Sequence, residues 1–478
     1  MEGALAVTDA SGPRLEPASF RDPDSRVFYA GGRVLRALSV QGFADWQALA
    51  ASDLFRGKVA EGKLVPTEPV ASGDGLPAEL RDSGYAAVLA HERIPFVSYP
   101  YEWPFGMLRD AALLQLELLL DALDEGLILK DATPYNIQWR GASPVFVDVG
   151  SFERLRAGEP WAGYRQFCML FLYPLLLQAY RGVPFQSRLR GSLEGISPAE
   201  CRSLLSGRDR FRRGVLAHVV LHARLEGRYG DRRRDVKREL RAAGFHEGLI
   251  RANVRRLEKL VRGLRWEPGR SAWSSYAEES PYTEADAAAK EAFVREAAAG
   301  RRRRLAWDLG CNDGRYTRIA AESADYTVAL DADATVVEEL YRTLRAEGSA
   351  TILPLVSDIG DPSPGLGWRG LERSRLEERG RPELTLCLAL LHHVVISANI
   401  PVAAFLDWLA SLRTELVIEL PTRDDPMVQR LLAGKGPDSN PDYGTESFER
   451  ALSERWEVAR REVLPSGTRI LYRAAPRT

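Results

Sequence analysis

The stretch Leu305-Ala-Trp-Asp-Leu-Gly-Cys-Asn-Asp-Gly314 decides how the second half of this chain folds. A short apolar run ends in Asp308, glycines follow at positions 310 and 314, and a polar segment with helical character begins at Arg315. This order predicts a buried strand, a tight glycine turn and a helix start, which is the layout of a nucleotide-binding crossover. Glycine suits such a turn because it adopts positive φ freely and lets a ligand approach the backbone.

The spacing within the turn favours one class of ligand. The pattern Asp-x-Gly-x-x-x-Gly has two glycines, whereas the dinucleotide fingerprint uses three to seat a pyrophosphate. With an acid ahead of the turn, the loop suits a ligand that carries a cation and a ribose, such as S-adenosylmethionine (SAM). The segment resembles the first motif of class I SAM-dependent methyltransferases. That resemblance implies cofactor contacts from Asp308, Gly310, Cys311, Asn312 and Gly314.

The segments after the turn continue an alternation of strands and helices. Further strands are predicted at Tyr326–Leu330, Ala350–Leu355, Leu384–Leu391 and Glu415–Leu420, and a terminal hairpin is predicted at Trp456–Leu464 and Thr468–Ala474. Strands that alternate with helices predict a parallel sheet covered on both faces, closed here by an antiparallel edge. The expected fold class of this half is therefore α/β, with a Rossmann-like class I methyltransferase sheet.

Polar residues follow two of these strands. Asp331, with Ala332 beside it, lies about twenty residues beyond the glycine turn, where an acid can take ribose hydroxyls. Asp358 and Ile359 follow the third strand, where the resemblance implies a contact with the adenine. Each acid also has a simpler interpretation, because Asp331 can cap the next helix and Asp358 can serve turn chemistry alone.

Two adjacent histidines, His392 and His393, stand at the end of the fourth strand, where an acceptor should meet the methyl group. Methyl transfer is a displacement that needs positioning and often a base to unmask the nucleophile. Histidine suits that role because its ordinary pKa lies near working pH. Either ring is a candidate general base, with His392 placed ahead of His393, and the alternative is a structural pair that only shapes the site.

Two tyrosines precede the helix predicted at about Glu284–Ala298. Helices ahead of the first strand often cover the SAM site in class I methyltransferases, so Tyr276 and Tyr282 are candidates to cover the cofactor. Ordinary aromatic packing at a domain joint is the alternative.

A second informative stretch lies in the N-terminal half. It reads Leu129-Lys-Asp131-Ala-Thr-Pro-Tyr-Asn136-Ile and then Pro144-Val-Phe-Val-Asp148-Val-Gly150. This succession resembles the catalytic core of protein-kinase-like phosphotransferases and predicts a kinase-like α+β domain. The resemblance implies that Asp131 accepts the substrate hydroxyl proton and that Asn136 and Asp148 hold Mg²⁺.

The same half departs from the kinase pattern at the nucleotide site. Val34-Leu-Arg36-Ala-Leu38 stands where a kinase has its ATP-binding strand, but Arg36 replaces the lysine, and no glycine-rich phosphate loop precedes it. Three interpretations stay open: an active kinase that uses Mg-ATP, a degenerate site that still binds a ligand, and a structural remnant.

Over the whole chain, the kinase-like motifs, the segment Pro160-Trp-x-x-Tyr-Arg-Gln-Phe167 and the methyltransferase module together resemble the nodulation-type (NoeA-like) SAM methyltransferases. The resemblance implies methyl transfer and says little about the acceptor, for which we expect an oxygen or nitrogen of a small molecule or saccharide. A bifunctional kinase–methyltransferase and a non-catalytic SAM-binding scaffold are the alternatives.

Length and charge set the remaining limits. At 478 residues the chain predicts two domains, 1–265 with a helical basic end and 266–478 with a helical cap. With 65 basic against 66 acidic residues, overall charge makes no case for nucleic acid or membrane, and the arginine-rich part at 202–270 fits a solvated helical face. Four scattered cysteines and the lack of a signal-like N-terminus lead us to expect a cytoplasmic protein without metal. The oligomeric state stays open.

Overall fold

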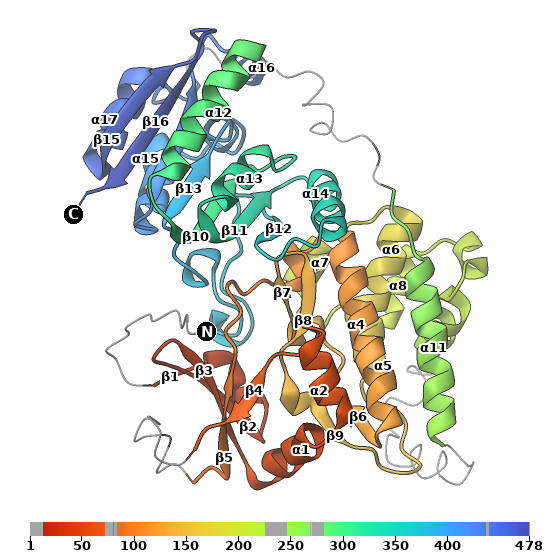
Figure 1. Ribbon diagram of the computed structural model, residues 1–478. Coiled ribbons are helices and arrows are strands. Elements are labelled where there is room, and N and C mark those ends of the chain that lie inside the picture. Colours follow the sequence, from red (N-terminus) through yellow and green to blue (C-terminus); the bar gives the residue numbers. More distant parts are fainter. Residues whose placement is uncertain are drawn as a thin grey trace.

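Two principal β-sheets organise the chain, one in each half (Figure 1). The computed structural model describes residues 13–71, 80, 84–224, 246–267, 269, 282–435 and 439–477. Tyr276 and the arginine cluster at 232–234 lie outside these residues. Among the helices in the described ranges, none is long and apolar enough to cross a membrane.

The C-terminal sheet has seven strands in the order β12-β11-β10-β13-β14-β16-β15. Its strands are β10 (Arg303–Leu309), β11 (Ala324–Asp331), β12 (Ile352–Val356), β13 (Leu384–Cys387), β14 (Glu415–Pro421), β15 (Trp456–Val463) and β16 (Arg469–Pro476). The first five strands in this order are parallel, while β16 pairs antiparallel with both β14 and β15. The five parallel strands follow the 3-2-1-4-5 order of a doubly wound sheet. The Rossmann-like prediction is therefore confirmed.

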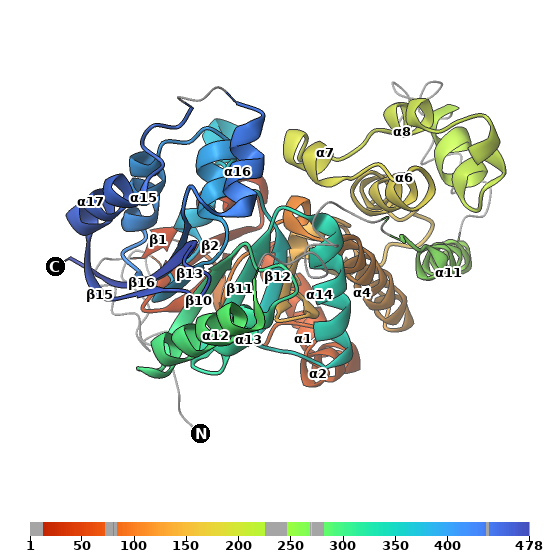
Figure 2. The same ribbon diagram turned by 90° about the horizontal axis from the view of Figure 1, so that it is seen from above.

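Helices cover both faces of this sheet. One face carries α12 (Glu284–Ala299), α13 (Arg315–Ala321) and α14 (Ala334–Ala346), and the other carries α15 (Val402–Ser411), α16 (Pro426–Ala433) and α17 (Thr445–Arg455), as Figure 2 shows. Strands covered on both sides need apolar residues throughout, which is why they read as continuous apolar runs in the sequence.

One predicted strand is too long. The apolar run Leu384–Leu391 leaves the sheet after Cys387, and Ala389 takes a left-handed conformation with φ 51°. The run stays apolar because Leu388 and Leu391 remain buried in the turn that follows. A turn of π-helix at His393–Ser397 then leads toward α15.

The N-terminal sheet is antiparallel, in the order β1-β2-β3-β5-β4. Its strands are β1 (Arg14–Leu15), β2 (Ser25–Ala30), β3 (Arg33–Leu38), β4 (Thr67–Pro69) and β5 (Ala87–His91), and α1 (Val40–Ala50) and α2 (Asp53–Ala60) separate β3 from β4. Arg36 lies in β3, paired in register with Leu89 of β5.

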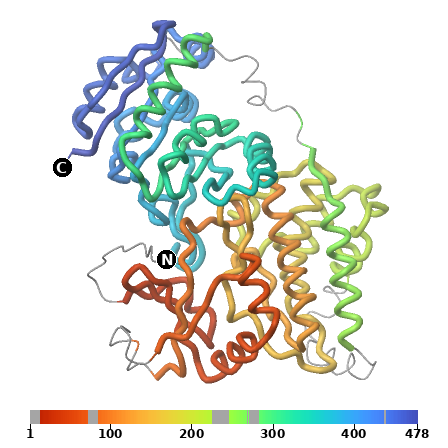
Figure 3. The backbone as a smooth tube through the Cα atoms, viewed as in Figure 1, coloured from red at the N-terminus to blue at the C-terminus, as the bar shows by residue number. Residues whose placement is uncertain are grey.

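A mainly helical part follows this sheet. It contains α4 (Phe105–Asp124), β6 (Leu127–Leu129), β7 (Ile137–Arg140), β8 (Ser143–Phe146), β9 (Phe152–Arg154), α5 (Tyr164–Phe167), α6 (Tyr173–Arg181), α7 (Gln186–Gly191), α8 (Pro198–Leu204) and α11 (Glu247–Gly263). β6 pairs with β9 and β7 with β8, so the loops that carry Asp131 and Asp148 lie between short paired strands. The amphipathic α11 packs along α4 (Figure 3).

The two halves are packed tightly against each other. The Tyr326 hydroxyl donates to the Trp139 carbonyl at 3.1 Å, and Glu102 and Arg379 form a fully buried ion pair at 2.5 Å. The segment between β12 and β13 extends toward the N-terminal half (Figure 3), where Arg21, from the short 3-10 helix between β1 and β2, donates to Glu372. One hydrophobic cluster contains residues of both halves. The domain boundary near residue 265 stays a prediction.

Candidate functional site

The glycine turn after β10 has the geometry that its sequence predicts. Gly310 and Gly314 have φ of 79° and 81°, and Asn312 joins them in the left-handed region at 46°. The amides of Gly310 and Cys311 both donate to the Leu330 carbonyl, at 2.8 and 3.0 Å. A Cβ at Gly314 would come within 2.7 Å of the Leu340 side chain. The turn thus depends on glycine for both conformation and space.

Asp308 is a buried carboxylate directly beneath this turn. It accepts the Thr317 hydroxyl at 2.6 Å from the first turns of α13, and 1% of its surface is exposed. Burial raises the pKa of Asp308 to about 6, against smaller opposing effects of Thr317 and Lys290. A buried acid without an ion pair is predisposed to a cationic ligand, because a nearby positive charge restores the stability that desolvation removes.

Asp331 ends β11 beside the turn. One carboxylate oxygen accepts the Asn312 amide at 3.0 Å and the other accepts the Asp333 amide at 2.9 Å. Burial raises the pKa of Asp331, in spite of these amide donors. The carboxylate is held rigidly, and each oxygen keeps a lone pair that can accept a ribose hydroxyl. Ala332, next to it, is exposed.

The end of β12 offers a different set of groups from the one the sequence suggested. Asp358 is exposed and accepts the Gly360 amide at 2.8 Å, as its turn interpretation predicts. Ile359 is buried. Ser357 lies between the end of β12 and Asp358, and its buried hydroxyl has no hydrogen-bond partner among the described residues. An orphaned hydroxyl at a strand's carboxyl end fits a site that holds a polar ligand.

The two histidines differ in what they can reach. Their rings lie 3.9 Å apart, centroid to centroid. His392 is fully buried, and burial followed by the charge of His393 holds its pKa well below the usual value. His393 is partly exposed, and burial with the Arg469 charge lowers its pKa to about 4. Both rings are therefore neutral near pH 7, but only His393 has a surface that an acceptor can approach.

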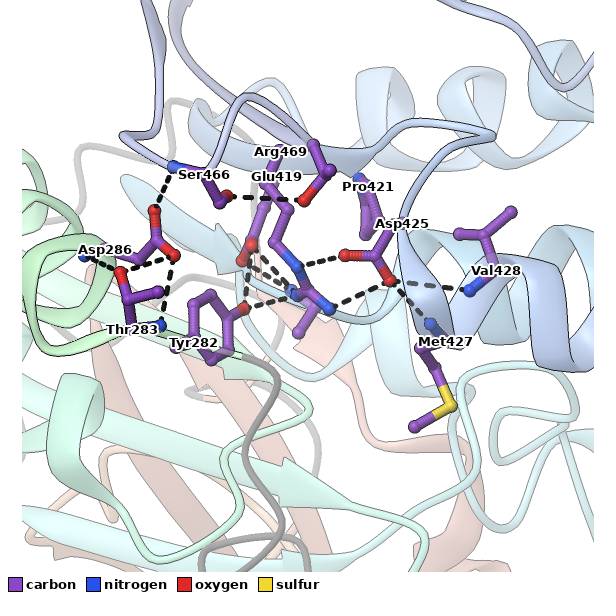
Figure 4. Close-up of polar contacts among 12 residues, drawn as sticks. Tyr282, Thr283, Asp286, Glu419, Pro421, Asp425, Met427, Val428, Ser466 and Arg469 are labelled. Atoms are coloured by element: carbon purple, nitrogen blue, oxygen red, sulfur yellow. Dashed lines mark hydrogen bonds and ion pairs between the residues drawn. The ribbon is translucent and has the colours of Figure 1, made fainter.

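A buried charge cluster that we call the Glu419 cluster adjoins these histidines, and the sequence reading missed it. Glu419 at the end of β14 accepts Lys290 Nζ at 2.7 Å, Arg469 Nη1 at 3.1 Å and the Tyr282 hydroxyl at 2.7 Å. Arg469 also forms an ion pair with Asp425, at 2.7 Å (Figure 4). A signal existed, because a glutamate inside the apolar run of a buried strand requires partners.

Electrostatics keep this cluster charged. Burial alone would favour the neutral acid at Glu419, but the charges of Lys290 and Arg469 outweigh it and lower the pKa of Glu419 to about 2. Burial also lowers the pKa of Lys290, and Glu419 offsets that effect. The Tyr282 hydroxyl donates to Glu419 in this cluster. Its role as a cover for the cofactor stays a prediction. For Tyr276 the prediction falls outside the described residues.

The kinase-like residues of the N-terminal half also meet. Arg36 forms an ion pair with Asp148 at 2.8 Å, the Ser151 hydroxyl donates to Asp148 at 2.6 Å, and the Asn136 amide donates to Ser151 at 2.9 Å. Burial would raise the pKa of Asp148, but Arg36 reverses the direction and the pKa lies below its usual value. Burial and then Asp148 raise the pKa of Asp131.

An arginine occupies the acid of this second cluster that the kinase resemblance assigns to a metal ion. In the part of the chain that the structure describes, no three His, Cys, Asp or Glu side chains gather as metal ligands. The Arg36 guanidinium already neutralises the carboxylate that a kinase would give to Mg²⁺. Arg36 therefore competes with Mg²⁺ for the Asp148 carboxylate, and nucleotide binding by this half stays a prediction.

The chain is similar in sequence to a known nodulation protein over nearly its whole length. No family model matches the chain. The nodulation protein NoeA of Rhizobium meliloti (strain 1021) is 34% identical over 476 residues, which cover 99% of this chain and 98% of the relative.

Among solved structures, the N-methyltransferase NodS of Bradyrhizobium japonicum WM9, in complex with S-adenosylhomocysteine, is 12% identical and covers 43% of this chain and 98% of its own, with a TM-score of 0.31. The magnesium protoporphyrin IX methyltransferase ChlM of Synechocystis PCC 6803, with the same molecule bound, is 16% identical and covers 44% of this chain and 90% of its own, with a TM-score of 0.30.

Proposed function

Because the chain belongs to the NoeA family of nodulation proteins, we propose that it is a methyltransferase that uses SAM and releases S-adenosylhomocysteine. The observation that carries the proposal is the pair of buried acids around one glycine turn. Asp308 lies beneath the turn with no ion pair among the described residues, and Asp331 is held beside it by two amides. This combination suits a ligand with both a positive charge and a ribose.

The residues at the edge of the sheet fit the cofactor group by group. Asp331 would accept the ribose hydroxyls, and Ser357 with the buried Ile359 would border the adenine, whereas Asp358 is turned to its own backbone. Asp308 would supply the negative charge that a bound cation needs. When bound, SAM supplies an electrophilic methyl group on a sulfonium. The chain's own residues orient the acceptor toward it and keep water out.

On the acceptor side we propose His393, ahead of His392, as the general base. Its ring is partly exposed and neutral near pH 7, so it can accept a proton from an oxygen or nitrogen nucleophile. The pKa of about 4 also makes it a weaker base than an ordinary histidine. His392 is fully buried and supports the other ring by contact. The acceptor we propose is a small molecule or saccharide, and its identity is not part of the proposal.

For the N-terminal half we propose a kinase-like scaffold without phosphotransfer. The order of its elements supports the kinase-like assignment, from the antiparallel sheet through α4 to the paired short strands around Asp131 and Asp148. The Arg36–Asp148 ion pair argues against the bifunctional alternative. The extensive contact with the C-terminal half supports a role in shaping or stabilising the methyltransferase.

Calorimetric titration of the full chain with S-adenosylhomocysteine tests this proposal. We expect saturable binding that Asp331→Asn weakens about tenfold or more, because each lost charge-assisted hydrogen bond to a ribose hydroxyl contributes about 1.5–3 kcal/mol. The matched control is Asp325→Asn, which neutralises an exposed acid at the opposite end of β11. Absence of binding to the wild-type chain would refute the proposal. Binding without turnover of any acceptor would favour the scaffold alternative.

A further inference from the structure

The Glu419 carboxylate is fully buried, and four hydrogen-bond donors leave it no vacant position for a substrate. Oε1 accepts from the Tyr282 hydroxyl and Arg469 Nη1, and Oε2 accepts from Lys290 Nζ and from the backbone amide of Ala389 at 3.0 Å. Figure 4 shows the Tyr282 hydroxyl between Glu419 and Arg469. Three of these donors are side chains that hold the carboxylate in place. The fourth belongs to the turn after β13.

Ala389 is the strained residue of that turn. Its φ of 51° is a left-handed conformation that an alanine rarely adopts, because its Cβ crowds the backbone. Such a conformation persists only where the surroundings determine it. Here the surroundings include an ionised acceptor for the Ala389 amide, and hydrogen bonds to charged acceptors are about twice as strong as neutral ones.

The turn also lies directly against the glycine turn of the proposed cofactor site. A Cβ built on Gly310 would be 3.5 Å from Leu390 Cβ and 3.8 Å from the Leu388 carbonyl oxygen. A shift of Ala389 would therefore move the wall that faces Gly310. It would also move His392 and His393, which begin three residues later.

We propose that Glu419 is a positioning residue: its carboxylate holds the Ala389 amide, and thereby keeps the left-handed turn at Leu388–Leu390 seated against Gly310 and beside the two histidines. The inference rests on the proposed function in assigning this wall to a SAM site. Tyr282 and Lys290, just before and within α12, and Arg469 from β16 bring two distant parts of the chain to the Glu419 carboxylate.

The test uses variants that remove the acceptor oxygen without unbalancing the buried charge. Lys290→Met with Glu419→Gln leaves a neutral side chain that can still accept the Ala389 amide, and Lys290→Met with Glu419→Leu leaves none. In both double variants Arg469 keeps Asp425 as its partner. Adding Ala389→Gly to the leucine variant removes the left-handed strain, because glycine adopts that conformation without cost. The two double variants have the same net charge and serve as each other's control.

Two measurements are made on each variant: amide hydrogen exchange of the peptide that covers residues 386–396 without ligand, and the Kd for S-adenosylhomocysteine by calorimetry. In the leucine variant we expect roughly tenfold faster exchange at Ala389 and roughly tenfold weaker binding than in the glutamine variant. With Ala389→Gly added, we expect binding to return to within about threefold of the glutamine variant.

Equal exchange in the leucine and glutamine variants would overturn the positioning role, and so would a failure of Ala389→Gly to restore binding. If the leucine variant does not fold, the glutamine double variant is compared with the single variant Lys290→Met. We expect faster exchange at Ala389 in the double variant, because its neutral acceptor is weaker than the Glu419 carboxylate. Equal rates would overturn the positioning role. If the wild-type chain binds no S-adenosylhomocysteine, the proposed function fails, while the exchange measurements still decide the role of Glu419.

Discussion

Replacing Asp308 by asparagine should stabilise the ligand-free protein and weaken its binding of SAM. Asparagine has nearly the same shape, and its amide oxygen can still accept the Thr317 hydroxyl that now bonds to the carboxylate. What disappears is a buried negative charge that forms no ion pair within the part of the chain that the structure describes. Lys290 is near enough to favour the charged form, and Asp331 and Asp313 oppose it, but burial exceeds all of these effects.

The size of the effect follows from the shift in pKa. The pKa of Asp308 rises from an ordinary 3.8 to about 6. One pKa unit corresponds to 1.36 kcal/mol, so the ionised group costs the folded state about 3 kcal/mol at neutral pH. The folded protein binds more protons than the unfolded chain between pH 3.8 and about 6, so stability falls as pH rises through that window and stays low above it. The gain from Asp308→Asn should therefore be about 3 kcal/mol at pH 7.5 and roughly half that at pH 5.

Urea unfolding of wild type and variant at both pH values measures this gain, and calorimetry with SAM measures the loss of affinity, for which we expect about tenfold or more. Asp325→Asn, an exposed acid paired with Arg302, is the control and should change stability by no more than about 0.5 kcal/mol. A destabilised Asp308→Asn variant, or a gain of equal size at both pH values, would refute the electrostatic reasoning. Unchanged SAM affinity would refute the role of the acid in binding.

Three further predictions test other parts of the structure. Arg379→Met should cost about 3–5 kcal/mol in urea unfolding because it leaves Glu102 buried and unpaired, and adding Glu102→Leu should recover most of the loss; equal stabilities of the single and double variants would contradict this. Mg-ATP should produce no saturable heat with the wild-type chain because Arg36 neutralises Asp148, and micromolar binding would restore the bifunctional alternative. In an NMR titration the His393 ring should gain its proton near pH 4. The stability of the folded protein should therefore fall as pH drops from about 6.5 toward 4, because the unfolded chain binds the proton more readily in that range. A midpoint near 6.5 would show that the ring is solvated.

The C-terminal sheet was predictable because its signals are local. Each parallel strand is buried on both faces and reads as an apolar run, and the glycine turn carries its own conformational requirement at Gly310 and Gly314. The length of one predicted strand was wrong. The run Leu384–Leu391 is apolar throughout, but only Leu384–Cys387 is strand, because burial in a turn and burial in a sheet place the same demand on composition.

The candidate site was only partly predictable. Asp308 and Asp331 could be proposed from the sequence because they lie near the carboxyl ends of β10 and β11, at a fixed spacing from the turn. His392 and His393 could be proposed in the same way, but the sequence could not show that one ring is buried and the other partly exposed, since adjacent residues share every local signal. The residues of the predicted kinase-like motifs could be named one by one from the sequence, while the ion pair that joins Arg36 to Asp148 depends on how the antiparallel sheet lies over the loop after β8.

Sequence by itself determined where the strands run, where the chain turns at the glycines, and which acids stand at the strand ends, because these depend on neighbouring residues and on a repeating pattern of burial. The tertiary structure alone decided that Lys290 and Arg469 meet at the buried Glu419 carboxylate, and that this carboxylate accepts the Ala389 amide. These residues come from a helix and two strands far apart in the chain. Their charges are tolerated in the core only because the fold brings opposite charges together.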